Sequence, residues 1–269
     1  MTNEQQIEHL VEKVQVNAKY AHISQDFIRR ISAEVLQKGF EGKSAVKAVR
    51  NKLHQVGGAY FRRNVDYDAL GDELTKLPGD IHSDIVRAFC RRIMGAHAST
   101  AERLPILDSF FSTCLAPIAP VTSILDLACG LTPLSLPWIP LKDGCAYTAC
   151  DIYRDMLEFI EYFFAHFHRD GTAQPCDLLG DIPEETAQVA FLLKTIPCLE
   201  QVEKNIGIKL LDGLQTRHIL VSFPAKSLSG RRKGMPTFYR DHFYEMIASK
   251  PWQVQEFEFS SEIAFLVTK

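Results

Sequence analysis

The chain has 269 residues, of which 46% are hydrophobic and 23% are charged, and this balance excludes a disordered or fibrous protein. No apolar run is long enough to cross a membrane, and the polar, acidic start of the chain is unlike a signal peptide. We therefore expect a cytoplasmic protein without a membrane partner. The seven cysteines form no Cys-x-x-Cys pair, which argues against a disulfide framework and against a metal site.

Positive charge is concentrated in one part of the chain, although the formal net charge is −3. Residues 27–63 hold nine Lys and Arg but only two acidic residues. A basic segment on an otherwise acidic protein indicates a nucleic-acid contact confined to the N-terminal third.

The first 110 residues are predicted to form a helical N-terminal subdomain. Apolar residues recur there at helical spacing in three stretches, Ile7–Val14, Phe27–Leu36 and Val46–Val56. On the third of these, Lys43, Lys47 and Arg50 recur three and four positions apart and form a basic face. Such a face either binds a phosphate backbone or is simply solvated, and the spacing alone leaves both alternatives open.

A later helix of this region is predicted to carry Arg87 and Arg91 on its outer side. Its apolar side is expected to hold Ile85, Phe89 and Ile93. This second basic face allows the same two interpretations.

Residues 111–269 are predicted to form an α/β domain, which the linker Ala116–Pro120 introduces. Strands are expected at Thr122–Leu127, Tyr147–Cys150, a short run ending at Cys176-Asp177, Val189–Lys194 and His218–Phe223. Helices are expected at Asp155–His166, Leu199–Gly213 and Thr237–Ser249. Two alternating runs, Val254–Phe259 and Ile263–Val267, then predict a terminal antiparallel hairpin. Five βα units followed by such a hairpin favour a Rossmann-like, doubly wound sheet of the methyltransferase type over an all-parallel dehydrogenase sheet.

The stretch Ile124–Trp138 is the main candidate for a ligand site. A buried strand that contains Asp126 is followed by the small-residue turn Ala128-Cys129-Gly130 and by an expected helix start, which is how an open α/β sheet makes a nucleotide site. Asp151 ends the next strand 21 positions after Gly130, at the distance expected for a carboxylate that accepts from ribose hydroxyls. The alternative is an ordinary strand–turn–helix in which both aspartates serve as caps or turn residues.

Further residues follow at the carboxyl ends of the later strands, where ligands bind in open α/β sheets. Asp177-Leu178 and Leu193-Lys194 lie there, and Asp177 is suited to accept from an adenine amino group. The series indicates a cofactor that contains adenosine. Because a phosphate-binding turn would have three glycines and only Gly130 is present, S-adenosylmethionine is favoured over a dinucleotide.

Two polar segments flank these strands. His97–Arg103 is interpreted either as a helix cap, with Ser99 or Thr100 at the N-cap, or as a cofactor contact in which Arg103 binds a carboxylate. Phe223–Gly234 follows the fifth strand with four basic residues, and we expect it to be a mobile clamp for an anionic substrate rather than an idle loop.

Together these stretches resemble the aminoglycoside-resistance 16S rRNA methyltransferases that modify N7 of guanine 1405 in the ribosomal decoding site. The matching segments span nearly the whole chain in the same order: Lys52–Tyr60 (KLHQVGGAY), His97–Pro105 (HASTAERLP), Ile124–Trp138 (ILDLACGLTPLSLPW), Leu192–Glu200 (LLKTIPCLE), Ser222–Met235 (SFPAKSLSGRRKGM) and the terminal SEIAFLV.

The resemblance implies a class I methyltransferase domain at 111–269 and a subdomain at 1–110 that docks on the 30S subunit, in a protein that works as a monomer. It implies an S-adenosylmethionine site lined by Tyr60, His97, Ser99, Arg103, Ala128, Gly130, Asp151, Ile152, Asp177, Leu178 and Leu193. It also implies that Lys194 positions the target. The residues implied to contact the 16S rRNA are Lys43, Lys47, Arg50, Arg62, Arg63, Lys226, Arg231, Arg232 and Lys233.

The sequence departs from the family pattern at Ala101 and Thr132, where Asn is frequent, and at Pro236-Thr237, where polar or acidic residues are common. The last departure leaves the contacts to the target base open. The rival interpretations are methylation of a neighbouring decoding-site nucleotide, methylation of a small molecule, and a non-catalytic RNA-binding protein that does not bind S-adenosylmethionine.

Overall fold

Apolar runs at the expected positions become the parallel strands of one sheet. The computed structural model describes residues 2–58, 65–225 and 235–269. The strands are β1 Val121–Leu127, β2 Leu141–Asp151, β3 Gly171–Pro175, β4 Val189–Leu193, β5 His218–Pro224, β6 Gln253–Glu258 and β7 Glu262–Thr268, in the sheet order β3-β2-β1-β4-β5-β7-β6. All five residues of β4 are buried, as expected for a central strand covered on both faces.

The predicted terminal hairpin is present and completes the sheet. Strand β7 lies between β5 and β6 and is antiparallel to both, whereas β1 to β5 are mutually parallel. Six residues of β7 are buried, and β6 at the edge is only partly buried. The doubly wound sheet with a terminal antiparallel hairpin is therefore confirmed.

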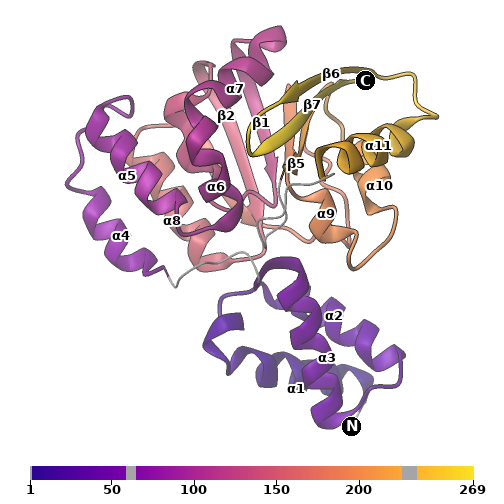
Figure 1. Ribbon diagram of the computed structural model, residues 1–269. Coiled ribbons are helices and arrows are strands. Elements are labelled where there is room, and N and C mark those ends of the chain that lie inside the picture. Colours follow the sequence, from indigo (N-terminus) through magenta and orange to yellow (C-terminus); the bar gives the residue numbers. More distant parts are fainter. Residues whose placement is uncertain (1, 59–64, 226–234) are drawn as a thin grey trace.

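Helices cover both faces of this sheet (Figure 1). They are α4 Tyr67–Leu74, α5 Asp84–Met94, α6 Ala98–Arg103, α7 Leu107–Leu115, α8 Arg154–His166, α9 Ile196–Leu199, α10 Ile206–Gly213 and α11 Met235–Ile247. The expectation of one helix from Leu199 to Gly213 was wrong. The chain leaves the helical conformation after α9, and Asn205 has a φ of +67° immediately before α10 begins.

The segment after β1 also differs from the expected α-helix. Thr132–Trp138 forms a 3₁₀ helix, which we label η5. Pro133 and Pro137 have no backbone N–H, so a regular α-helical ladder cannot form across this stretch. The nucleotide-site turn is consequently followed by a tight 3₁₀ segment.

The three predicted amphipathic stripes form a bundle below the sheet domain (Figure 1). Its helices are α1 Asn3–Gln15, α2 Gln25–Gln37 and α3 Gly42–Leu53, and α3 continues into a π-helical turn at His54–Gly58. Each contributes fully buried apolar side chains, such as Val14, Ile31 and Val49. By contrast, α4 packs on α8 and α7 packs on β7, so these helices lie against the sheet domain. The predicted boundary between residues 110 and 111 falls inside α7.

Backbone hydrogen bonds fasten the bundle to the sheet beside Asp151. The N–H of Ser24 donates to the carbonyl of Ile152 at 2.8 Å, and the N–H of Arg154 donates to the carbonyl of His22 at 2.9 Å. Ile23 and Tyr153 form an antiparallel bridge between these two bonds. The segment that leads into α2 is thus fixed to the loop after β2.

No helix in the described part of the chain is long and apolar enough to cross a membrane. Within the same residues no group of His, Cys, Asp and Glu is arranged to hold a metal ion. All seven cysteines are free thiols.

Candidate functional site

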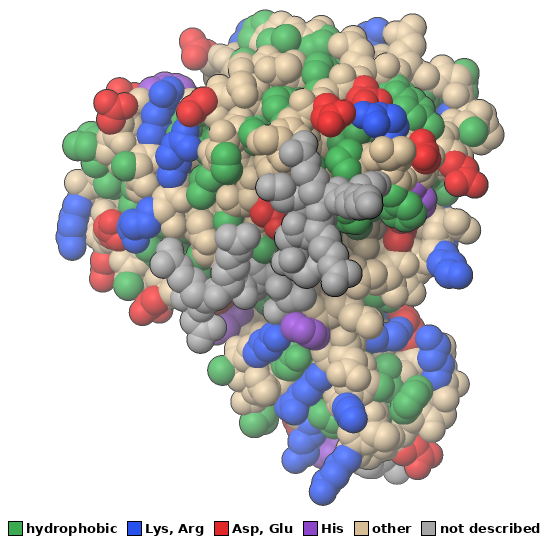
Figure 2. Space-filling model, viewed as in Figure 1, with side chains coloured by type: hydrophobic (Ala, Val, Ile, Leu, Met, Phe, Trp, Pro, Cys, Tyr) green, Lys and Arg blue, Asp and Glu red, His purple; other side chains and the backbone are tan. Residues whose placement is uncertain are grey.

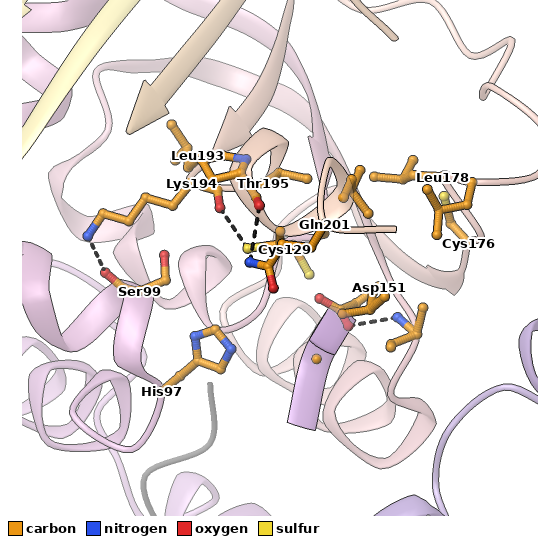
Figure 3. A pocket seen from close by; sticks show the side chains of 18 of the residues that line it. His97, Ser99, Cys129, Asp151, Cys176, Leu178, Leu193, Lys194, Thr195 and Gln201 are labelled. Carbon is orange, nitrogen blue, oxygen red and sulfur yellow. Dashed lines mark hydrogen bonds between the residues drawn. The ribbon is translucent and has the colours of Figure 1, made fainter. Parts of the chain in front are cut away.

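A cavity of about 450 Å³ opens at the carboxyl ends of β1, β2 and β4, where ligands bind in open α/β sheets. Its volume is suited to a small-molecule cofactor. Nine of the expected site residues meet in its wall, and Figure 3 shows how several of them lie: His97, Ser99, Ala128, Asp151, Ile152, Asp177, Leu178, Leu193 and Lys194.

Asp151 joins two strand ends at the floor of the cavity. One carboxylate oxygen accepts from the N–H of Gly130 at 2.9 Å, and the other accepts from the N–H of Ile152 at 2.7 Å. Burial raises the pKa of Asp151, against the opposing effect of these backbone donors. The carboxylate therefore holds the turn after β1 in place, and it lines the cavity as well.

The turn after β1 requires an unusual backbone. Ala128 and Gly130 have φ values of +51° and +50°, and Ala128 is exposed in the cavity wall. A Cβ added at Gly130 would lie 3.0 Å from the His97 ring. Glycine at this position therefore makes room for His97, and Gly130, which was expected to line the cofactor site, lies behind the cavity wall that Ala128 forms. Strained backbone of this kind is typical of ligand sites.

Asp126 is not part of the cavity wall. Its side chain is buried beneath the turn and accepts a hydrogen bond from the Tyr147 hydroxyl at 2.7 Å. Burial raises the pKa of Asp126 to about 7, and the hydrogen bond from Tyr147 opposes this shift. The sequence singled out this carboxylate as part of the buried strand before the turn, and in the fold it pairs with Tyr147.

Asp177 is held by a residue that the sequence did not single out. Arg30 of α2 binds both of its carboxylate oxygens, one of them from Nη2 at 3.0 Å. One of these oxygens also accepts from the N–H of Leu179 at 3.0 Å. The bundle α1–α3 is thereby connected to the cavity by an ion pair, and Asp177 has few lone pairs left for an adenine amino group.

Lys194 follows β4 with a φ of +60°, and its side chain lies along the cavity wall. Its ammonium group donates to the carbonyl of Ser99 at 3.1 Å, as Figure 3 shows, and to the carboxylate of Glu102 at 3.0 Å. A third oxygen, from Glu262, lies 3.4 Å away. The side chain is only 6% exposed, so Lys194 joins β4 to α6 and β7 instead of extending toward the surface.

Arg103 lies behind the cavity wall and is completely buried. Its guanidinium binds both oxygens of Glu262, at 2.7 and 3.0 Å, and lies 4.8 Å from the centre of the Phe110 ring. The expected carboxylate partner is therefore a residue of the chain itself. The predicted contact of Arg103 with a cofactor carboxylate stays a prediction, and in this structure its two bidentate donors bind Glu262.

The capping interpretation of this segment was wrong. Helix α6 begins at Ala98, with His97 at the N-cap and no side-chain hydrogen bond at the cap. The Thr100 hydroxyl instead donates to the carbonyl of Met94 at 2.6 Å, inside the protein. This leaves His97 and Ser99 in the cavity wall.

Lys and Arg side chains gather on the lower lobe in Figure 2, which is formed by α1–α3. A groove of about 1000 Å³ between α1 and α3 is lined by apolar residues such as Val16 and Leu36 and by basic ones, among them His9, Lys13, Lys43, Lys47 and Arg50. Lys43 and Lys47 are exposed, whereas Arg50 is partly buried and donates to the carbonyl of Lys13 at 2.8 Å. The predicted basic face is thus present, and two of its three side chains project into solvent.

The second predicted basic face is occupied by internal contacts. Arg87 and Arg91 lie over the Trp138 ring, at 5.6 and 5.0 Å from its centre, and Arg91 pairs with Asp108. Ile85, expected on the apolar side, is 63% exposed. These arginines attach α5 to η5 and α7.

Seven expected site residues lie outside the described part of the chain: Tyr60, Arg62, Arg63, Lys226, Arg231, Arg232 and Lys233.

Residues 16–267 match the family described as ribosomal RNA methyltransferase (FmrO). The chain belongs to the FmrO family. It is 31% identical over 269 residues to a 16S rRNA (guanine(1405)-N(7))-methyltransferase of Micromonospora echinospora, which covers 99% of this chain and 98% of the relative. It is 32% identical over 272 residues to the protein of the same description from Frankia casuarinae, which covers 100% and 95%.

Two solved structures of 16S rRNA methyltransferases share the fold over 98% of this chain. The crystal structure of the 16S rRNA methyltransferase RmtF in complex with S-adenosyl-L-homocysteine superposes with a TM-score of 0.82 at 28% identity, covering 98% of both chains. The 16S rRNA methylase RmtB superposes with a TM-score of 0.79 at 25% identity, again covering 98% of each.

Proposed function

We propose that this FmrO-family protein transfers a methyl group from S-adenosylmethionine to N7 of guanine 1405 in the decoding site of 16S rRNA, within the 30S subunit, and so confers aminoglycoside resistance. The observation that carries the proposal is the full-length similarity to enzymes described by that reaction. The cavity at the strand ends supplies a site of suitable size.

The residues of the cavity suit an adenosine-containing cofactor. Asp151 lies where a carboxylate accepts from ribose hydroxyls. Ala128 has a positive φ and lines the cavity, so the backbone after β1 is open to a ligand. Leu178 and Leu193 provide apolar surface for an adenine ring. Asp177 contributes less than expected to adenine recognition, because Arg30 holds it.

S-adenosylmethionine supplies an electrophilic methyl group on a sulfonium, and the lone pair of guanine N7 accepts that methyl as the carbon–sulfur bond breaks. No proton has to be removed from N7 before this transfer, so the reaction needs no general base. The protein contributes by holding the donor and acceptor in line and by excluding water. A paired or stacked guanine also has to be turned out of its helix to enter the cavity.

The bundle α1–α3 is proposed to dock on the rRNA through phosphate contacts. Lys43 and Lys47 project from it, and the ion pair between Arg30 and Asp177 connects its second helix to the cavity. We propose that the enzyme acts in the cytoplasm as a monomer on the assembled 30S subunit, and size-exclusion chromatography with light scattering checks the monomer.

The test is methyl transfer from labelled S-adenosylmethionine to 30S subunits, 50S subunits and free 16S rRNA, with the modified base mapped. Label on N7 of guanine 1405 in the 30S subunit alone is the expected result. Label on a neighbouring decoding-site nucleotide would correct the target. Binding of the cofactor without label on any RNA would overturn the proposal and favour a small-molecule substrate.

A further inference from the structure

Four charged side chains form a buried cluster behind one wall of the cavity. Glu262, at the start of β7, is completely buried and binds Arg103 through both oxygens. It also accepts from the Ser222 hydroxyl at 2.5 Å and lies 3.4 Å from the Lys194 ammonium. Glu102 pairs with Lys194 at 3.0 Å. Strands β4, β5 and β7 and helix α6 therefore meet at one carboxylate.

The cluster is electrically balanced. Arg103 and Lys194 supply two positive charges, and Glu102 and Glu262 supply two negative charges. Burial on its own would raise the pKa of Glu262, but the two cations and the hydrogen bonds from Arg103 and Ser222 outweigh it and lower that pKa. Glu262 is consequently ionised at neutral pH. Without its charge, the cluster would carry a net positive charge in a poorly solvated place.

Lys194 carries one of these charges into the cavity wall, where the cofactor of the proposed function binds. S-adenosylmethionine has a positive sulfonium, and its product S-adenosylhomocysteine has a neutral thioether in the same position. A cation without a counter-charge beside the cavity would therefore weaken the binding of S-adenosylmethionine more than the binding of S-adenosylhomocysteine. Neutralisation of Lys194 removes this penalty.

We propose that Glu262 is a positioning residue that acts through Lys194. Together with Glu102 it holds the ammonium group along the wall, and its charge completes the balance of the cluster, so that the cavity accepts a positively charged cofactor. This inference rests on the proposed cofactor but not on the identity of the RNA target. It assigns a role in the site to a residue of the terminal hairpin, which does not itself line the cavity.

The test compares the dissociation constants of S-adenosylmethionine and S-adenosylhomocysteine, measured by calorimetry on the purified full chain. Glu262→Gln leaves the cluster with an excess positive charge. We expect it to raise the ratio of the S-adenosylmethionine constant to the S-adenosylhomocysteine constant by about tenfold. This is the effect of a unit charge about 10 Å away at an effective dielectric constant of about 20. Lys194→Met leaves an excess negative charge and is expected to lower the same ratio. A purely structural role would weaken the binding of both ligands equally.

The double variant Glu262→Gln/Lys194→Met restores the balance and is expected to return the ratio toward the wild-type value. Glu256→Gln is the matched control, because it removes a carboxylate of the same hairpin that pairs with Arg240 away from the cavity. It should leave the ratio unchanged. If Glu262→Gln does not fold, Lys194→Met alone tests the inference, because an unaltered ratio of dissociation constants in that variant overturns it.

Failure of this inference is distinguishable from failure of the proposed function. Wild-type protein that binds both ligands but methylates no rRNA refutes the proposed reaction. The role of Glu262 is then still tested by the ratios of dissociation constants in the variants. Wild-type protein that binds neither ligand refutes both proposals. Wild-type methylation of guanine 1405 with ratios that do not respond to either substitution refutes the role of Glu262 alone.

Discussion

One carboxylate oxygen of Asp151 accepts the N–H of Gly130 at 2.9 Å, and this bond ties the end of β2 to the turn after β1. The two residues are 21 positions apart, and the parallel pairing of the two strands brings them together. The side chain proposed to hold the cofactor therefore also shapes the turn against which the cofactor lies.

Asp151→Ala is expected to abolish detectable cofactor binding while the protein remains folded. The substitution removes the ribose acceptor and also leaves the Gly130 N–H without its partner, which costs about 1–3 kcal/mol of stability. Calorimetry with S-adenosylhomocysteine and a thermal melt measure the two effects. Asp143→Ala, at an exposed position of the same strand, is the control and should change neither. Full activity of Asp151→Ala would count heavily against the proposed site.

Arg30→Ala is expected to weaken cofactor binding by about threefold to tenfold, because the ion pair with Asp177 fixes the segment that places Leu178 in the cavity wall. Arg29→Ala is the matched control on the same helix. Its guanidinium pairs with Glu8 and Asp26, away from the cavity. Equal affinities in the two variants would show that the link between α2 and Asp177 does not influence the site.

The stability of the protein is expected to fall as the pH rises from about 4 to 7, in part because of Asp126. Its pKa is raised to about 7 in the folded state from an ordinary value of 3.8, so the folded protein retains a proton that the unfolded chain releases. The stabilisation is complete below the ordinary pKa and is lost as the pH approaches 7, at up to about 1.4 kcal/mol per pH unit.

Asp126→Asn should flatten this pH dependence, because an amide can still accept from the Tyr147 hydroxyl but does not ionise. Urea unfolding of both proteins at several values between pH 4 and 8 measures the difference. Parallel pH profiles for the two proteins would show that the pKa of Asp126 is the same in the folded and unfolded states.

Lys43→Ala and Lys47→Ala are each expected to weaken binding to 30S subunits and to reduce the slope of log K against log salt by about one. Both side chains are exposed beside the groove between α1 and α3. Lys142→Ala removes an exposed charge from the start of β2, at the sheet end remote from the cavity, and should leave the slope unchanged. An identical loss in all three variants would mean that only the overall charge of the protein matters.

Local patterns in the sequence were sufficient to predict most of the fold. Short apolar runs such as Val189–Leu193 have the length of a strand buried on both faces, and the alternation near the C-terminus predicts the hairpin. The prediction failed where a backbone preference overrode the pattern, as at the prolines of η5 and at Asn205 before α10. The cavity residues at the strand ends were predictable because parallel strands place their carboxyl ends at one edge.

The partners of charged side chains were not predictable in the same way. Arg103 and Glu262 are 159 positions apart, and Arg30 and Asp177 are 147 apart. Nothing local to Arg103 distinguishes a bidentate pair with Glu262 from one with a ligand carboxylate, because the guanidinium suits both. Only the three-dimensional course of the chain decides between them.

The place of β7 in the sheet has a consequence for the order of folding. Strand β6 lies at the edge and reaches the rest of the sheet through β7, which pairs with β5 on its other side. Strand β6 therefore joins the sheet only when β7 has paired with β5. The same pairing brings the carboxylate of Glu262 to Arg103 and Lys194, so the sheet edge and the charge cluster are completed in one step.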